Sequence, residues 1–173
     1  MMVPVSVESV RASLMSAQRL VVLKQAGEER YLPIWIGPFE ADAIAMELQG
    51  IESPRPMSHD LLKQAILVLG GKVSYVAVHT LRHDTFFASV VLDQRGQELR
   101  LDARPSDSIA LAVRAKAPIL VDSSVMDRAG LTKERDIREQ EQEQPDEETL
   151  EVFREFIEEL SFDDSGERAE EDA

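Results

Sequence analysis

The chain of 173 residues contains no cysteine. This absence excludes disulfide bonds and metal sites built from thiolates. The sequence also has no apolar run as long as a membrane span, and its N-terminus lacks the charged and then apolar pattern of a signal peptide. We therefore expect a cytoplasmic protein.

The sequence has fewer basic than acidic side chains, which gives it a net charge of -14. The acidity is uneven, because residues 133–173 hold 18 acidic and 5 basic side chains, whereas residues 1–132 hold 15 acidic and 14 basic ones. The larger part is thus close to neutral. It lacks the excess of lysine and arginine that usually marks a nucleic-acid-binding surface.

This division of charge predicts two regions, a folded domain over residues 1–132 and an acidic tail over residues 133–173. The tail contains the polar linker EQEQEQ (139–144) and then a helical pattern over residues 146–160. One side of that expected helix carries four large apolar residues, namely Leu150, Phe153, Ile157 and Leu160. Such a helix is not stable alone, so we expect it to dock on the domain, on a second copy or on a partner.

Within residues 1–132 the pattern predicts a mixed α/β fold of the α+β type. Three strands joined by short connections are expected over residues 3–36, with a turn at 15–18, and a hairpin over residues 73–92. Helices are expected over residues 38–49, 58–69 and 107–116. Their apolar stripes, such as Leu61, Leu62, Ala65, Ile66 and Leu69 in the second, predict a core face. The expectation is a mixed, antiparallel-rich sheet packed against about three short helices, with the acidic helix added at the C-terminal end.

The stretch LDARPSDSIALAVRAKAPILV (101–121) is the centre of this pattern. Alternating residues from Leu99 to Ala103 predict a half-buried strand, and Ser106 or Asp107 is expected to cap the helix that follows. Ile119–Val121 then predicts a buried strand. Polar side chains crowd the turn between strand and helix, where rigid elements can hold a ligand.

Four stretches resemble the bifunctional nuclease family, namely LPIWIGPFEADAIAMELQG, RPMSHDLL, FFAS and DARPSDSIALAVRAKAPI. The resemblance covers residues 3–130. It implies a small α/β domain with ribonuclease and deoxyribonuclease activity and, together with the apolar content, a homo-oligomer, expected to be a dimer. Ser108 departs from the family pattern, which more often has alanine there. The motif positions are Gly37, Glu40, Arg55, Pro56, His59, Asp60, Asp102, Arg104, Pro105, Ser106 and Asp107.

Phosphodiester hydrolysis needs an activated water and neutralisation of charge at phosphorus. The candidate catalytic residues are His59, Asp60, Asp102 and Asp107. The candidate phosphate-binding residues are Arg55, Arg104 and Ser106. The candidate ligands of Mg²⁺ or Mn²⁺ are Glu40, Asp60, Asp102 and Asp107, and no organic cofactor is expected. The chain has no DxD or HExxH motif, so distant segments must assemble any metal site. We expect seven of the candidates to converge in space, namely Glu40, Arg55, His59, Asp60, Asp102, Arg104 and Asp107.

Each candidate also has a structural interpretation. Glu40, Asp60 and Asp107 stand in first turns of helices, where an acid stabilises the helix, and the arginines can pair with those acids. His59 can be a neutral hydrogen-bonding group and Ser106 a helix cap. Two functions stay open: a metal-assisted nuclease acting on RNA and DNA with little sequence preference, or a non-enzymatic binding or regulatory module whose polar pocket recognises an anion or partner.

Overall fold

The structure, a computed structural model, describes residues 1–12 and 18–132. Its seven strands are β1 (Met2–Ala12), β2 (Arg19–Gln25), β3 (Tyr31–Ile36), β4 (Gly71–Arg82), β5 (Thr85–Gln94), β6 (Gln97–Ala103) and β7 (Ile119–Asp122). Its helices are α1 (Pro38–Leu48), α2 (Ser58–Val68), α3 (Pro105–Ala115) and α4 (Ser123–Ala129). The expected turn at 15–18 falls largely, and the C-terminal helix entirely, outside the described residues.

All seven strands form one sheet in the order β3-β2-β1-β7-β4-β5-β6. The β1, β2 and β3 strands pair antiparallel, as their short connections predict. Among the described strands β4 and β7 form a parallel pair, whereas the neighbours on either side of them pair antiparallel. The predicted α+β fold with a mixed, antiparallel-rich sheet is therefore confirmed.

The β4–β5 and β5–β6 connections are tight hairpins. His83 and Asp84 have positive φ angles of 46° and 58°, and Arg95 and Gly96 have positive φ angles of 56° and 85°. Two successive positive φ angles give the turn whose twist matches that of the flanking strands. Asp93 stabilises the second turn by accepting a hydrogen bond from the Gly96 N–H at 2.8 Å.

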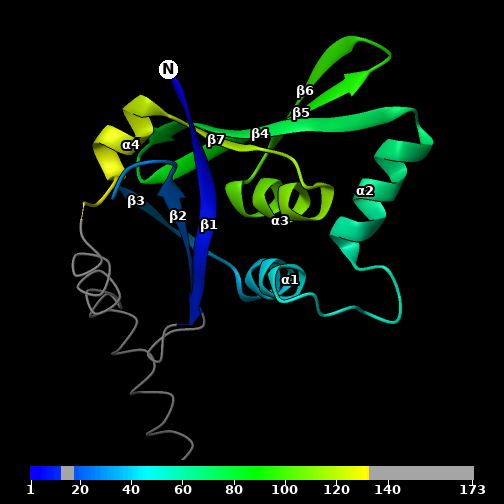
Figure 1. Cartoon of the computed structure of the whole chain (residues 1–173), viewed down its shortest axis with the longest axis horizontal. Coiled ribbons are helices and arrows are strands. Elements are labelled where there is room, and N and C mark those ends of the chain that lie inside the picture. The colour runs from blue at the N-terminus through cyan, green and yellow to red at the C-terminus, as the bar shows by residue number, and fades with distance from the viewer. Residues whose placement is uncertain (13–17, 133–173) are drawn as a thin grey trace, which may run out of the picture.

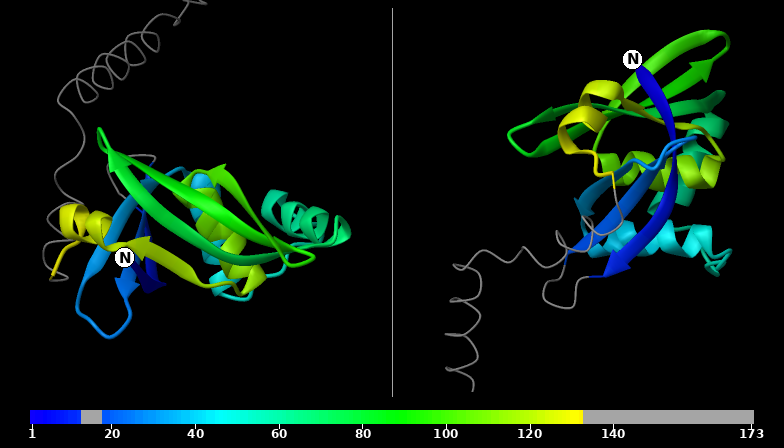
Figure 2. Two further views of the ribbon diagram at one scale, coloured as in Figure 1. Left: turned by 90° about the horizontal axis from the view of Figure 1, so that it is seen from above. Right: turned by 60° about the vertical axis from the view of Figure 1, so that its left-hand side comes forward.

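The α3 helix lies at the centre of the domain, between the sheet and the other long helices (Figure 1). Seen from above, β4, β5 and β6 lie over α3 and α1 (Figure 2). Ile109, Ala110, Leu111 and Ala112 are all buried, as expected for a helix covered on more than one face. They join side chains from the inner face of the sheet in one core. This core fixes where the N-terminus of α3 points.

The start of one helix differs from expectation, and one helix was not predicted. The α3 helix begins at Pro105 with Arg104 as N-cap, not at Ser106 or Asp107, because proline has no N–H to leave unpaired and suits the first helical position. The α2 helix begins at Ser58, as expected, with Met57 as its N-cap. The sequence also missed α4, a helix of seven residues that the Asp122 side chain caps by accepting from the Ser124 N–H.

Side chains in two elements that were expected to face the core are exposed. Of the α2 stripe only Ile66 is buried, while Leu61, Leu62 and Leu69 are 61%, 41% and 73% exposed. Leu101 is 45% exposed because β6 is an edge strand. The described residues include no helix that is long and apolar enough to span a membrane.

Candidate functional site

Three helices begin close to one another, and each has an acidic residue at its third position. In α1 and α3 a proline occupies the first position, and Glu40 and Asp107 occupy the third. In α2 the third residue is Asp60. The contacts of His59 with Asp107 and of Arg104 with Glu40 bring the three N-termini together. An acid at this position is stabilised by the helix dipole whether or not it has another role.

Four side chains form a connected network, which we call the Arg104 cluster (Glu40, His59, Arg104 and Asp107). The Arg104 Nε donates to Asp107 Oδ2 at 2.8 Å, and its Nη2 donates to Glu40 Oε1. Asp107 Oδ1 lies 3.0 Å from His59 Nε2. Gly37 leaves room for Glu40, since a Cβ at that position would collide with the Glu40 carboxylate. Residues far apart in sequence thus meet at one point.

The Arg104 cluster lines a cavity of about 710 Å³. The rest of the lining is mainly apolar and includes Phe39, Ala43, Met46 and Met57. Phe39 is 83% exposed, and the Arg104 side chain is 65% exposed. A ligand with an anionic group and an apolar ring therefore finds a reachable guanidinium beside apolar surface.

The charges in the Arg104 cluster support one another. Burial opposes ionisation of Asp107, but hydrogen bonds from Arg104 and His59 outweigh it and hold the pKa of the Asp107 carboxyl below its ordinary value. Asp107 and then Glu40 raise the pKa of Arg104. The cluster therefore presents an ionised carboxylate to His59 and a permanent cation to solvent.

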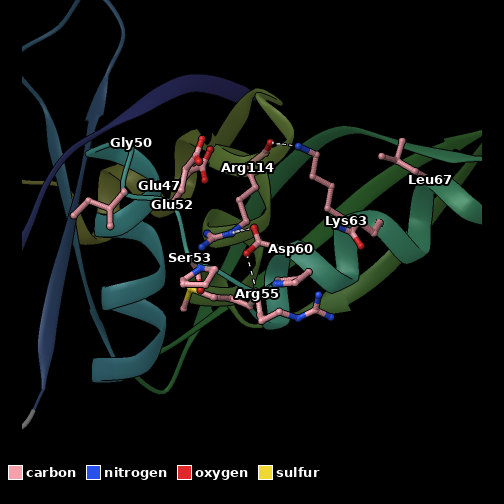
Figure 3. A pocket seen from close by; sticks show the side chains of 14 residues that line it. Glu47, Gly50, Glu52, Ser53, Arg55, Asp60, Lys63, Leu67 and Arg114 are labelled. Carbon is pink, nitrogen blue, oxygen red and sulfur yellow. Dashed lines mark hydrogen bonds and ion pairs between the residues drawn. The ribbon is translucent and has the colours of Figure 1, made fainter.

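Asp60 and Arg55 lie at a neighbouring cavity of about 630 Å³ (Figure 3). There Asp60 Oδ1 accepts from Arg114 Nε at 2.8 Å, and Oδ2 accepts from the Met57 N–H at 2.9 Å. Burial opposes ionisation of Asp60, yet the Met57 N–H and the Arg114 guanidinium hold the pKa of Asp60 below its ordinary value. Lys63 Nζ donates to the Arg114 carbonyl at 2.7 Å. The contacts of Asp60 thus suit a stabilising role.

Arg114 was not among the candidate residues, and its side chain is only 3% exposed. It donates to the Ala110 carbonyl at 3.0 Å as well as to Asp60. An arginine in the last turn of a helix has a general explanation in the helix dipole, so its position alone did not single it out.

Two further candidates lie away from the Arg104 cluster. Asp102 pairs with Ser89 across β5 and β6, and its neighbour Leu101 pairs with Val90 of the core. Successive side chains of a strand point to opposite faces, so Asp102 lies on the outer face of the sheet. Ser106 is 5% exposed and lines a separate cavity of about 270 Å³, which Arg104 also borders.

Comparisons with known proteins place the chain in a family. A model of the bifunctional nuclease domain matches residues 21–134, which include the whole Arg104 cluster. The chain belongs to the bifunctional nuclease domain family. An uncharacterized protein of Mycobacterium tuberculosis is 39% identical over 160 residues, covering 92% of this chain and 96% of its relative.

Plant proteins match a shorter stretch of the chain than the mycobacterial protein does. Bifunctional nuclease 1 of Oryza sativa subsp. japonica is 30% identical over 115 residues, which are 64% of this chain and 35% of the rice protein. Bifunctional nuclease 2 of Arabidopsis thaliana is 31% identical over 105 residues, 58% of this chain and 32% of its own length. The chain thus spans about a third of the length of these plant relatives.

The four carboxylates expected to bind a metal do not form a ligand set in this bifunctional nuclease domain. Arg104 holds Glu40 and Asp107, Arg114 holds Asp60, and Asp102 is on the outer face of the sheet. Within residues 1–12 and 18–132 no three histidine or acidic side chains are placed to hold one metal ion. The arrangement shown therefore does not fit Mg²⁺ or Mn²⁺, because guanidinium groups take the oxygens that a cation needs.

The lowered pKa values of Asp60 and Asp107 predict loss of stability of the bifunctional nuclease domain in acid. A carboxyl whose folded-state pKa lies below its unfolded-state value stabilises the fold above the unfolded-state pKa, and this contribution disappears as pH falls through the folded-state pKa. We expect the free energy of unfolding, measured in urea, to decrease as the pH falls below the ordinary carboxyl pKa. This decrease with pH should be less steep in Asp60→Asn. Equal pH dependence of the unfolding free energy in the two proteins would contradict the prediction.

Proposed function

We propose that this bifunctional nuclease domain hydrolyses phosphodiester bonds of RNA and DNA at the Arg104 cluster. The observation that carries the proposal is a solvent-reachable guanidinium held beside a histidine–carboxylate pair on the wall of a cavity. The plant relatives named bifunctional nucleases support the same reaction class.

Arg104 would bind the phosphate that is cleaved. A guanidinium presents N–H groups in a planar fork that matches two phosphate oxygens, and its charge stabilises the charge that develops at phosphorus. Asp107 and Glu40 hold the Nε and one Nη of Arg104. The exposure of the side chain leaves its other N–H groups accessible.

His59 would transfer protons. The ionised Asp107 carboxylate can only accept, so His59 Nε2 carries the hydrogen of their shared bond and the lone pair of the neutral ring is on Nδ1. Nδ1 would take a proton from an attacking water as its oxygen bonds to phosphorus. The bond from phosphorus to the leaving oxygen then breaks, and that oxygen takes the proton from His59.

The cavity lining favours little sequence preference. Phe39, Ala43, Met46 and Met57 offer apolar contact, and their side chains do not read the hydrogen-bonding edges of bases. Arg55, exposed at the neighbouring cavity, would contact a flanking phosphate. With a domain close to neutral, we expect binding to be weak and to fall further with added salt.

An assay on labelled single-stranded RNA and DNA, run with Mg²⁺, Mn²⁺ or EDTA, tests the function. No proposed step passes through a metal ion, so we expect cleavage of both substrates that survives EDTA. Cleavage lost in EDTA would instead show that the carboxylates leave Arg104 to bind a cation. Binding of either substrate without any cleavage would favour the binding or regulatory module.

A further inference from the structure

One face of α2 is apolar and exposed, and the Arg104 cluster does not use it. The α2 apolar face consists of Leu61, Leu62, Ala65, Val68 and Leu69. These positions follow the helical repeat along one side, whereas His59, Asp60 and Lys63 make their contacts from other sides of the helix. Val68 and Leu69 are 85% and 73% exposed. A contiguous apolar patch of this kind marks an interaction site.

We propose that the acidic C-terminal segment of the same chain, residues 146–160, docks on the α2 apolar face. Its sequence repeats Leu150, Phe153, Ile157 and Leu160 at spacings of three and four, which put all four on one side of a helix. The patch runs along one side of α2 from Leu61 to Leu69, which suits packing against a single amphipathic helix. Covering the patch removes large apolar side chains from water, which favours docking.

Charge supports this occupant. Residues 146–160 hold seven acidic side chains and one arginine. Arg55 precedes α2 and Lys72 follows it, and the Gln94 side chain donates to the Leu69 carbonyl at 2.9 Å, which brings the turn with Arg95 to the same end. These three exposed cations have no ion pair with any residue in the described part of the chain. Glutamates beside the apolar stripe would meet them.

The connection is long enough to reach α2. The 13 residues from 133 to 145 span at most about 43 Å when extended. A compact domain of 132 residues has a radius of gyration of about 14 Å, so an extended connection is comparable to the width of such a domain. The described chain ends after α4, which lies at the opposite end of the domain from α2 (Figure 1), so docking on the same molecule requires a nearly extended connection.

Because the full chain has no native cysteine, introduced cysteine pairs give a clean test. Val68→Cys is combined in turn with cysteine at Leu150, Phe153, Ile157 or Leu160, and the control replaces Val68→Cys with Glu28→Cys in the exposed β2–β3 turn. We expect at least one Val68 pair to form an intramolecular disulfide at least about tenfold faster than its control pair, at a rate independent of protein concentration. Equal rates for the two sets, or disulfide-linked dimers of Val68→Cys alone, would overturn the proposal, the latter in favour of a second copy.

A second measurement does not depend on disulfide geometry. The single variant Val68→Cys is alkylated by a thiol reagent in the full chain, with and without Phe153→Asp and Ile157→Asp. We expect the two aspartates to speed alkylation at least about fivefold, because they release the segment that shields position 68. Unchanged alkylation would overturn the proposal, and the result does not depend on nuclease activity.

Discussion

Replacing Arg104 by alanine is expected to lower kcat for phosphodiester cleavage about 100-fold or more, the usual cost of losing a donor aimed at developing negative charge. Arg104 is the cation of the cluster and its side chain is 65% exposed, so it can bind phosphate in addition to Glu40 and Asp107. The Arg104 end of these ion pairs is solvated, whereas the Glu40 and Asp107 side chains are 17% and 31% exposed, so we expect their loss to cost about 1 kcal/mol. The melting temperature should therefore fall by only a few degrees, about the shift that 1 kcal/mol produces.

Arg104→Lys separates charge from geometry. Lysine keeps the positive charge but lacks the planar fork, so we expect it to recover only part of kcat. Arg55→Ala is the matched control, because it removes an exposed arginine outside the cluster and should raise KM more than it lowers kcat. An Arg104→Ala protein with wild-type kcat would remove this residue from the proposed reaction.

Replacing Asp60 by alanine is expected to lower the free energy of unfolding by about 2–3 kcal/mol, because it leaves a buried guanidinium without its carboxylate. The Arg114 side chain is 3% exposed, whereas the side chain of Asp60 is 32% exposed. Asp60 also accepts the Met57 N–H at the start of α2, and that contact is lost as well. Chemical unfolding in urea measures the effect.

Removing the other partner of this ion pair, with Arg114→Met, should lower the free energy of unfolding by only about 1 kcal/mol. Methionine fills similar space, and the partly exposed Asp60 can be hydrated. The loss of unfolding free energy in Asp60→Asn should lie between those of Asp60→Ala and Arg114→Met, because asparagine keeps an acceptor for the Met57 N–H but loses the charge. If Arg114→Met cost as much as Asp60→Ala, burial of an unpaired charge would not explain the effect.

Local sequence patterns predicted the parts of the site that depend on neighbouring residues. Acids in first turns of helices placed Glu40, Asp60 and Asp107 correctly along their helices, and the strand–helix–strand pattern placed Arg104 at the turn before α3. The hairpins followed from turn residues. Each of these features is decided within a few positions along the chain.

The remaining features depend on packing between distant segments. Asp102 is two residues from Arg104, but strand alternation puts it on the outer face, and only the register with β5 shows which face is outer. The apolar stripe of α2 predicted burial, yet periodicity does not say what covers a stripe. Arg114 becomes significant only when α2 brings Asp60 to it. Convergence of the candidates was therefore partial, with four in the Arg104 cluster.

The most direct test of the account compares Asp107→Asn with Asp102→Asn in the same nuclease assay. The two substitutions are chemically identical, but Asp107 contacts His59 and Arg104, whereas Asp102 lies on the outer face of the sheet. We expect Asp107→Asn to lower kcat about 100-fold or more and Asp102→Asn to retain the wild-type value. Loss of activity in Asp102→Asn with wild-type activity in Asp107→Asn would contradict it.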